Sequence, residues 1–155
     1  METTKNKTTL LIMAAGMGSR FGSLKQLALL GPHKKTLLHY SIYDAVHAGF
    51  DKIVFIIRRS FENEFKEAVG KYAESLVETV YCFQEMDQLP GNLPPIQREK
   101  PWGTAHAIWA AKDHIHEPFI AINADDFYGR DAFVKMHDFV ASNTDERCFS
   151  LAGYR

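Results

Sequence analysis

The sequence lacks the features that would place it in a membrane, in a disulfide-rich secreted fold or on nucleic acid. No apolar run approaches the roughly 20 residues of a membrane-spanning helix, and residues 1–7 are polar, without the apolar segment of a signal peptide. The two cysteines, Cys82 and Cys148, have no metal-ligand spacing, so we expect them to fill the core in a reducing compartment. The net charge of −1 gives no general attraction to nucleic acid or acidic membranes. We therefore expect a cytoplasmic protein with small-molecule partners, and the composition leaves a homo-oligomer open.

What the chain does have is the composition of an ordinary globular protein, with 155 residues that are 46% apolar and 24% charged. This length suits one domain, residues 1–155, with a real core. Apolar runs and helical spacing alternate along the chain. They predict strands at 9–15, 52–57, 77–83, 118–123 and 147–151, and helices at 36–48, 61–75, 103–114 and 130–141. This βαβαβαβαβ order predicts an α/β fold with a three-layer, mostly parallel sheet.

The end of the chain suggests that the pattern continues further. The predicted strand at 147–151 stops without a turn, a cap or a polar tail, where natural domains seldom end. We therefore expect the chain to be the N-terminal part of a longer enzyme pattern, truncated at its C-terminus.

A glycine-rich loop follows the first predicted strand. Gly16, Gly18 and Gly22 allow the backbone to turn sharply and to bring its N–H groups close to an anion. The same loop carries Arg20 and Lys25, and two cations held on one loop favour a polyphosphate as the ligand. The loop is thus predicted to bind a nucleoside triphosphate.

Two further segments are candidates for ligand binding. One is a pair of aspartates after a predicted strand, and the other is the start of a predicted helix. Asp125 and Asp126 come directly after the strand at 118–123, and Mg²⁺ prefers one or two carboxylates together with phosphate oxygens and water. Asp125 is the first choice of metal ligand, with Asp126 as a second ligand or a neighbour that binds through water. Gly103 and Ala105 at the start of a helix leave space for a planar group against the backbone, and Thr104 can cap the helix or hydrogen-bond a base or ribose. The loops after parallel strands share one edge of the sheet, where ligands bind, so these segments should converge.

Other interpretations of these patterns stay open. The glycine spacing also fits a dinucleotide-binding loop, and Arg58 and Arg59 end the second strand where a 2′-phosphate of NADP would bind. An NADP-binding oxidoreductase domain is therefore one alternative, and a non-catalytic nucleotide-binding module is another. His106 is better explained as a packing or capping histidine than as a catalytic residue.

Together the motifs resemble those of the sugar-phosphate nucleotidyltransferases. Residues 11–20, with Lys25 beyond, resemble the family's signature, residues 101–107 its second motif, and residues 122–129 its metal-aspartate segment. Lys25 and Gln26, close behind the arginine, are also similar to cytidylyltransferases acting on small alcohol phosphates. The resemblance implies a nucleotide-diphospho-sugar transferase fold of the GT-A type. It also implies a Mg²⁺-dependent reaction of a nucleoside triphosphate with a sugar 1-phosphate or a similar phosphate monoester, which releases pyrophosphate.

The resemblance also implies a role for each matching residue. Arg20 would take the leaving pyrophosphate, and Lys25 would meet the α-phosphate or the acceptor phosphate. Gln97 is the nearest match to the family's base-reading glutamine, and Asp125 would hold Mg²⁺. The implied nucleotide-binding residues are Ala14, Ala15, Gly16, Met17, Gly18, Ser19, Gln97, Gly103 and Thr104. Family members continue beyond this length, and their later part supplies acceptor contacts and a second metal ligand.

Overall fold

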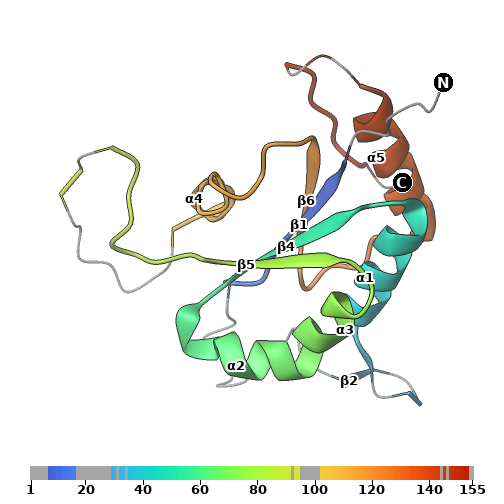
Figure 1. Cartoon of the computed structure of the whole chain (residues 1–155), viewed down its shortest axis with the longest axis horizontal. Coiled ribbons are helices and arrows are strands. Elements are labelled where there is room, and N and C mark those ends of the chain that lie inside the picture. The colour runs from blue at the N-terminus through green and yellow to red at the C-terminus, as the bar shows by residue number, and fades with distance from the viewer. Residues whose placement is uncertain are drawn as a thin grey trace.

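The computed structural model describes residues 7–16, 29–30, 32–33, 35–91, 93–94, 102–143, 145 and 147–153. Within them a parallel four-stranded sheet has the strand order β5-β4-β1-β6 (Figure 1). Its strands are β1 (Thr9–Met13), β4 (Lys52–Ile57), β5 (Glu78–Phe83) and β6 (Phe119–Asn123). A short antiparallel pair consists of β2 (Leu29–Leu30) and β3 (Lys35–Thr36). The helices are α1 (Leu37–Ala48), α2 (Glu62–Phe65), α3 (Lys71–Glu74), α4 (Thr104–Trp109) and α5 (Arg130–Ser142).

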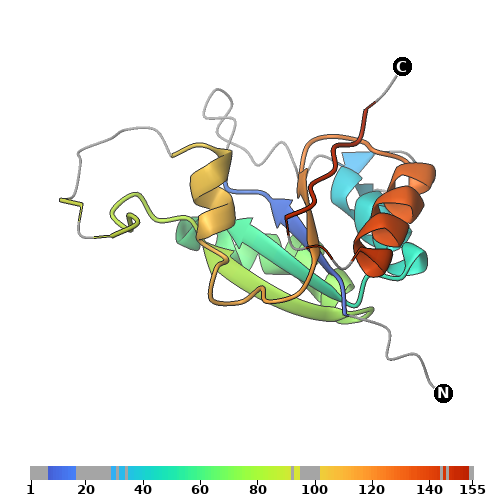
Figure 2. The same cartoon turned by 90° about the horizontal axis from the view of Figure 1, so that it is seen from above.

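Helices cover both faces of the sheet, which makes the three layers that the sequence predicted (Figures 1 and 2). Alternate residues of β1 point to opposite faces, as the pleat of a strand requires. Leu10 and Ile12 pack with α1, α5 and the helical segment 59–74 in the larger core, while Leu11 packs against α4 in the smaller one. All three are fully buried, as expected for a parallel strand covered on both sides.

The helix predicted at 36–48 is bounded by the caps that its sequence contains. Thr36 is the N-cap residue of α1, and its backbone N–H donates to Nδ1 of His39 at 3.2 Å. Gly49 ends the helix with a φ of 112°, a left-handed conformation that glycine adopts without a steric penalty. The buried face of α1 consists of Leu38, Ser41, Ile42 and Ala45, at the predicted helical spacing.

The helix predicted at 61–75 is a continuous helical segment of mixed geometry. A 3₁₀ turn at Arg59–Phe61 precedes α2, and a π-helical turn at Lys66–Gly70 separates α2 from α3. The helix predicted at 103–114 is regular only over α4. Beyond it the chain tightens, since Lys112 N–H bonds Trp109 O at 3.0 Å and His114 N–H bonds Ala111 O at 2.9 Å. These i→i−3 bonds carry the turn on as far as His114.

The strand predicted at 147–151 does not form, so this prediction is wrong. These residues are irregular, and the side chains of Phe149 and Leu151 are 90% and 96% exposed. An apolar alternation becomes a strand only when a neighbouring strand takes up its backbone hydrogen bonds, and no described strand pairs with this stretch. Cys148 is accordingly exposed rather than in the core, whereas Cys82 is buried as predicted.

The amino edge of the sheet is held by a largely buried ion pair. Lys52 at the start of β4 places Nζ 2.9 Å from Oε1 of Glu117, with 11% and 18% of the two side chains exposed. The Thr9 hydroxyl of β1 donates to the same Glu117 oxygen, and Lys52 also donates to His114 O at 2.5 Å. The cluster therefore ties β1 and β4 to the connection between α4 and β6.

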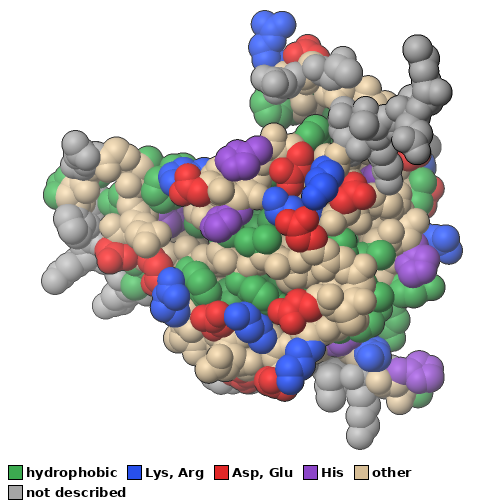
Figure 3. Space-filling view, viewed as in Figure 1, with side chains coloured by type: hydrophobic (Ala, Val, Ile, Leu, Met, Phe, Trp, Pro, Cys, Tyr) green, Lys and Arg blue, Asp and Glu red, His purple; other side chains and the backbone are tan. Residues whose placement is uncertain are grey.

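Two properties bear on the possible binding partners: the charge on the surface and the apolar character of the helices. Basic and acidic side chains are interspersed on the face shown in Figure 3. None of the helices in the described part of the chain combines the length and the apolar character needed to cross a bilayer.

Candidate functional site

The strand order creates a switch point between β1 and β6. From β1 the chain crosses to β4 on one side, while β6 pairs with β1 on the other, and ligands in such sheets bind outside the carboxyl ends at this position. The register pairs Met13 at the end of β1 with Asn123 at the end of β6. Residues 14–16, which begin the glycine loop, and the turn with the two aspartates therefore leave the sheet from neighbouring strands, at the one edge that the sequence predicted for both.

The start of the glycine loop is fixed by the core on both sides. Ala14 N–H donates to Ile56 O at 2.8 Å, and the side chains of Ala14 and Ala15 are 4% and 1% exposed, one in each core. Any contact that these two residues make with a nucleotide must therefore come from the main chain. Gly16 is exposed, and a Cβ there would meet no atom within 4 Å among the described residues.

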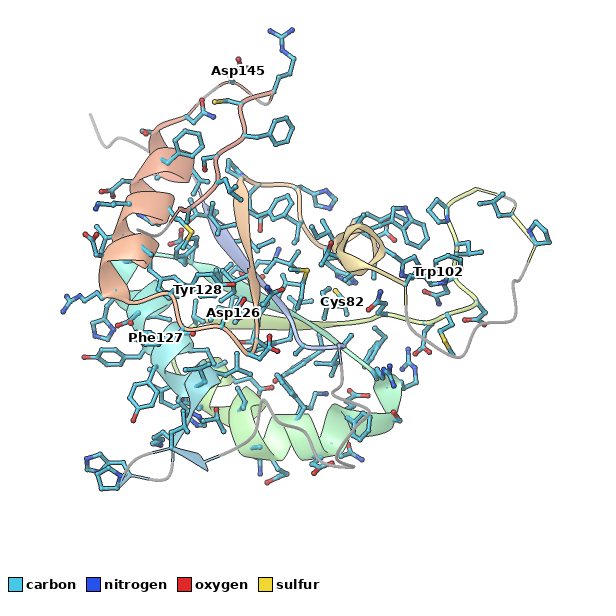
Figure 4. All side chains as sticks on the ribbon, turned by 180° about the vertical axis from the view of Figure 1, so that it is seen from behind. Cys82, Trp102, Asp126, Phe127, Tyr128 and Asp145 are labelled. Atoms are coloured by element: carbon cyan, nitrogen blue, oxygen red, sulfur yellow. The ribbon has the colours of Figure 1, made fainter. Side chains whose placement is uncertain are left out.

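The aspartates lie on a turn that is held at several points. Ala124, just before them, is buried and its N–H donates to Met13 O at 3.1 Å. Asp126 accepts through Oδ2 from Asn123 Nδ2 at 2.8 Å and from the Tyr128 hydroxyl at 3.4 Å (Figure 4). Asp125 is exposed and makes no hydrogen bond or ion pair to another described residue. The turn therefore presents one unengaged and one engaged carboxylate at the carboxyl edge.

The chemistry of these donors suits a magnesium ion that arrives with phosphate. Nowhere in the described ranges do three or more His, Cys, Asp or Glu side chains gather as a closed metal site. Mg²⁺ is commonly held by only one or two carboxylates, with phosphate oxygens and water completing its shell. The Asp125–Asp126 turn fits that arrangement.

The segment after β5 is joined to the start of α4 by Gln84. Gln84 is 7% exposed, and its N–H extends the sheet pattern by donating to Ile57 O at 3.1 Å. Its Nε2 donates to Trp102 O at 2.9 Å and approaches Gly103 O at 3.4 Å. Sequence reasoning missed Gln84, whose only signal was an amide side chain directly after an apolar strand.

Two aromatic side chains reinforce this junction. Trp102 Nε1 donates to Met86 O at 3.0 Å, and His106 Nε2 lies 2.6 Å from Gln88 O. His106 Nδ1 is 3.2 Å from Gln84 Nε2, which can only donate, so Nδ1 accepts and Nε2 carries the proton. His106 is therefore engaged with the main chain and with Gln84, as the structural interpretation of this residue predicted.

Helix α4 lies close to β1 because its packing residues are small. Ala107 and Ala111 are buried against Leu11 and Ala15 in the smaller core. Gly103 and Thr104, at the start of the helix, are both exposed. The described parts of all three predicted segments thus lie at the carboxyl edge of the sheet.

Several predicted residues lie outside the part of the chain that the structure describes. They are Met17, Gly18, Ser19, Arg20, Lys25 and Gln97. Their roles remain predictions from the sequence.

Arg59, one of the two arginines considered for an NADP phosphate, has other partners in the structure. Arg59 Nε lies 3.4 Å from Glu85 Oε1, and its guanidinium is 4.0 Å from the centre of the Phe83 ring. A carboxylate beside the guanidinium disfavours a phosphate at the same place. This arrangement weakens the dinucleotide alternative.

Comparison with known proteins agrees with the nucleotide-binding interpretation of this site. A family model described as nucleotidyl transferase matches residues 9–154. The chain is 28% identical over 130 residues to the UTP–glucose-1-phosphate uridylyltransferase of Bacillus subtilis, covering 75% of this chain and 43% of the other. It is 30% identical over 107 residues to the bifunctional protein GlmU of Staphylococcus haemolyticus, covering 69% of this chain and 19% of the other.

A solved structure shares the fold. The crystal structure of a UDP-glucose pyrophosphorylase complexed with UDP-glucose superimposes with a TM-score of 0.57 and 21% identity, covering 86% of this chain and 53% of that one. The chain thus spans about half the length of that structure and less than half of the curated relatives. The expected α/β architecture is confirmed by the sheet, its layers and this likeness.

Proposed function

Because the chain belongs to the nucleotidyl transferase family, we propose that it transfers a nucleoside monophosphate from a nucleoside triphosphate to a sugar 1-phosphate or a similar phosphate monoester, releasing pyrophosphate. The observation that supports this most directly is the pairing of Met13 with Asn123. It brings the origin of the glycine loop and the aspartate turn to neighbouring positions at the switch point, where a nucleotide's phosphates would meet both.

In this proposal the described residues bind and orient the nucleotide. The main chain at Gly16 would approach the phosphates, and Gly103 and Thr104 would contact the nucleoside from the start of α4. Gln84 would keep that contact in place through its bond to Trp102 O. Arg20 and Lys25, assigned from the sequence, would neutralise the leaving pyrophosphate and the α-phosphate or acceptor phosphate, and Gln97 would read the base.

The reaction requires positioning and charge neutralisation more than proton transfer. A phosphate monoester oxygen is already ionised near neutral pH, so the acceptor needs no general base. Holding two polyanions in line, and stabilising the charge that develops on the bridging oxygen and pyrophosphate, accounts for catalysis of this kind. Asp125, with Asp126 beside it, would hold Mg²⁺, which when bound offsets negative charge on the phosphate oxygens.

The substrates and the location are part of the proposal. The names of the relatives make UTP and glucose 1-phosphate the first pair to test. Two unpaired cysteines, one buried and one exposed, support the reducing, cytoplasmic location that we propose.

The test measures nucleotide binding and turnover separately. The chain is screened against the common nucleoside triphosphates with Mg²⁺ by thermal shift. A ligand at 100 times its Kd should stabilise the fold by about 2.7 kcal/mol. Pyrophosphate release is then followed with glucose 1-phosphate and other sugar phosphates. Asp125→Asn should lower release by roughly 10²-fold, the loss typical of removing one preorganised electrostatic contact.

The control is Asp131→Asn, which makes the same chemical change on an exposed residue of α5 that pairs with Lys135 at 2.6 Å. It should leave both measurements unchanged. Absence of a Mg²⁺-dependent shift with every nucleotide would refute the proposal. Binding without pyrophosphate release for any acceptor would instead support a non-catalytic nucleotide-binding module.

A further inference from the structure

Tyr128 connects the aspartate turn to the strand before it and to the core. Its hydroxyl lies 2.9 Å from the backbone nitrogen of Asn123 and 3.4 Å from Oδ2 of Asp126. A hydroxyl has one proton to donate and can accept as well, so it accepts from the Asn123 N–H and donates to the Asp126 carboxylate. The ring packs edge-on against Phe133, with centroids 6.1 Å apart, and Phe133 is fully buried. The hydroxyl is thus fixed in position by a ring that the core holds.

The backbone N–H of Asn123, which donates to the Tyr128 hydroxyl, points away from the interior of the sheet. Ala124 N–H bonds Met13 O of β1, and successive N–H groups of a strand point in opposite directions. The N–H of Asn123 therefore faces the outer edge of β6. Tyr128 satisfies this donor at the residue where the strand ends and the turn begins.

The same oxygen of Asp126 receives a second hydrogen bond, from the Asn123 side chain at 2.8 Å. A metal ion at Oδ2 would have to compete with two donors that the chain supplies. Asp125, in contrast, has no partner among the described residues and lies between buried Ala124 and restrained Asp126. The two adjacent carboxylates are therefore not equivalent.

We infer that Asp126 is a positioning residue, held by Tyr128 and Asn123, and that this clamp orients Asp125 as the carboxylate that contacts the metal directly. This inference rests on the proposed function. The sequence left Asp126 as either a second metal ligand or a neighbour, and the inference assigns it a positioning role without direct contact to the metal. Outer-shell hydrogen bonds of this kind typically change metal affinity by about 10–100-fold when they are removed.

The first test examines the clamp without any ligand. Exchange of the Asn123 backbone amide with solvent deuterium is followed by NMR in the wild type and in Tyr128→Phe. The amide should be protected in the wild type and exchange at least about tenfold faster in the variant, because its acceptor is gone. Tyr40→Phe, on the exposed side of α1, is the matched control and should leave this amide unchanged. Equal exchange in the wild type and Tyr128→Phe would overturn the inference.

The second test measures Mn²⁺ affinity by electron paramagnetic resonance, with a non-hydrolysable nucleotide present. Asp125→Asn should weaken binding by roughly 100-fold or more, whereas Tyr128→Phe and Asp126→Ala should each weaken it about tenfold. Asp126→Asn should recover most of the loss seen in Asp126→Ala, because an amide oxygen can still accept from Asn123 and Tyr128. A direct ligand would lose affinity in both Asp126 variants.

The outcomes separate this inference from the proposed function. If Asp126→Asn weakens Mn²⁺ binding as much as Asp125→Asn does, the positioning role is overturned while the metal site stands. If the wild type binds no Mn²⁺, or Asp125→Asn binds it normally, the metal role in the proposed function fails. Thermal denaturation of each variant identifies any that do not fold, and Tyr128→Phe, which removes one oxygen atom, still tests the clamp if Asp126→Ala unfolds.

Discussion

Replacing Glu117 by glutamine should destabilise the fold at neutral pH and change its response to acid. Burial alone would raise the pKa of Glu117. Hydrogen bonds from Thr9, Lys52 and the backbone of His116, together with the charge of Lys52, outweigh burial and lower the pKa from 4.5 to about 2. The folded state therefore holds the carboxylate in its ionised form more strongly than the unfolded chain does.

The expected loss of stability follows from the lowered pKa of Glu117. One pKa unit corresponds to about 1.4 kcal/mol, so lowering the pKa of Glu117 from 4.5 to about 2 contributes at most about 3 to 4 kcal/mol to the free energy of unfolding at neutral pH. Glutamine can still accept from Thr9, but it leaves Lys52 without its counter-charge, which is costly for a side chain that is 11% exposed. We expect Glu117→Gln to lose about 2–3 kcal/mol, or roughly 5–10 °C in Tm for a chain of this size.

The assay is chemical denaturation of the wild type and Glu117→Gln from pH 7 to pH 2. The folded pKa is depressed, so the contribution is present above pH 4.5 and is lost as pH falls towards about 2. The difference between the two proteins should therefore shrink steadily across this window. Adding Lys52→Met to Glu117→Gln should cost less than the sum of the two single changes, because the pair is coupled.

Glu64→Gln is the matched control. It makes the same chemical change at a residue that is exposed on α2 and lies outside the cluster of Glu117, Lys52 and Thr9. It should leave the free energy of unfolding within about 0.5 kcal/mol of the wild type. Equal stability of Glu117→Gln and the wild type at pH 7 would refute the reasoning. A difference that does not diminish in acid would refute it as well.

Two further predictions concern packing in the larger core. Gly70→Ala should destabilise the protein by about 1–3 kcal/mol, although glycine-to-alanine changes inside helices usually stabilise. The reason is that a Cβ at Gly70 would overlap the Tyr81 hydroxyl and lie 3.2 Å from its Cζ. Denaturation should show a smaller loss for Gly70→Ala when it is measured in a Tyr81→Phe background, and an unchanged loss would argue against this contact. His137→Leu should stabilise the fold by about 1 kcal/mol, because His137 is 6% exposed and neither ring nitrogen has a hydrogen-bond partner among the described residues. A lower Tm for this variant would show that the imidazole has a favourable role in the core.

Local chemistry determined most of the helices and strands. The apolar run at 52–57 matches β4 at both ends, and the helix at 36–48 begins after Thr36 and ends at Gly49. These elements depend on interactions within a few residues, such as caps, turn conformations and side-chain periodicity. The same kind of pattern was misleading at 147–151, where the apolar alternation has no described strand beside it and the side chains are exposed.

The sequence by itself also determined which segments carry the chemistry, because a glycine loop, an aspartate pair and a small-residue helix start can be recognised from the residues alone. Only the tertiary structure decided how they are held. Met13 pairs with Asn123, Gln84 reaches Trp102, and Glu117 meets Thr9. It also decided that Asp125 and Asp126, adjacent in the chain, have different environments. Such contacts join residues far apart in the sequence or depend on the direction of one side chain, so they arise only once the strands are ordered and the core fixes each group in place.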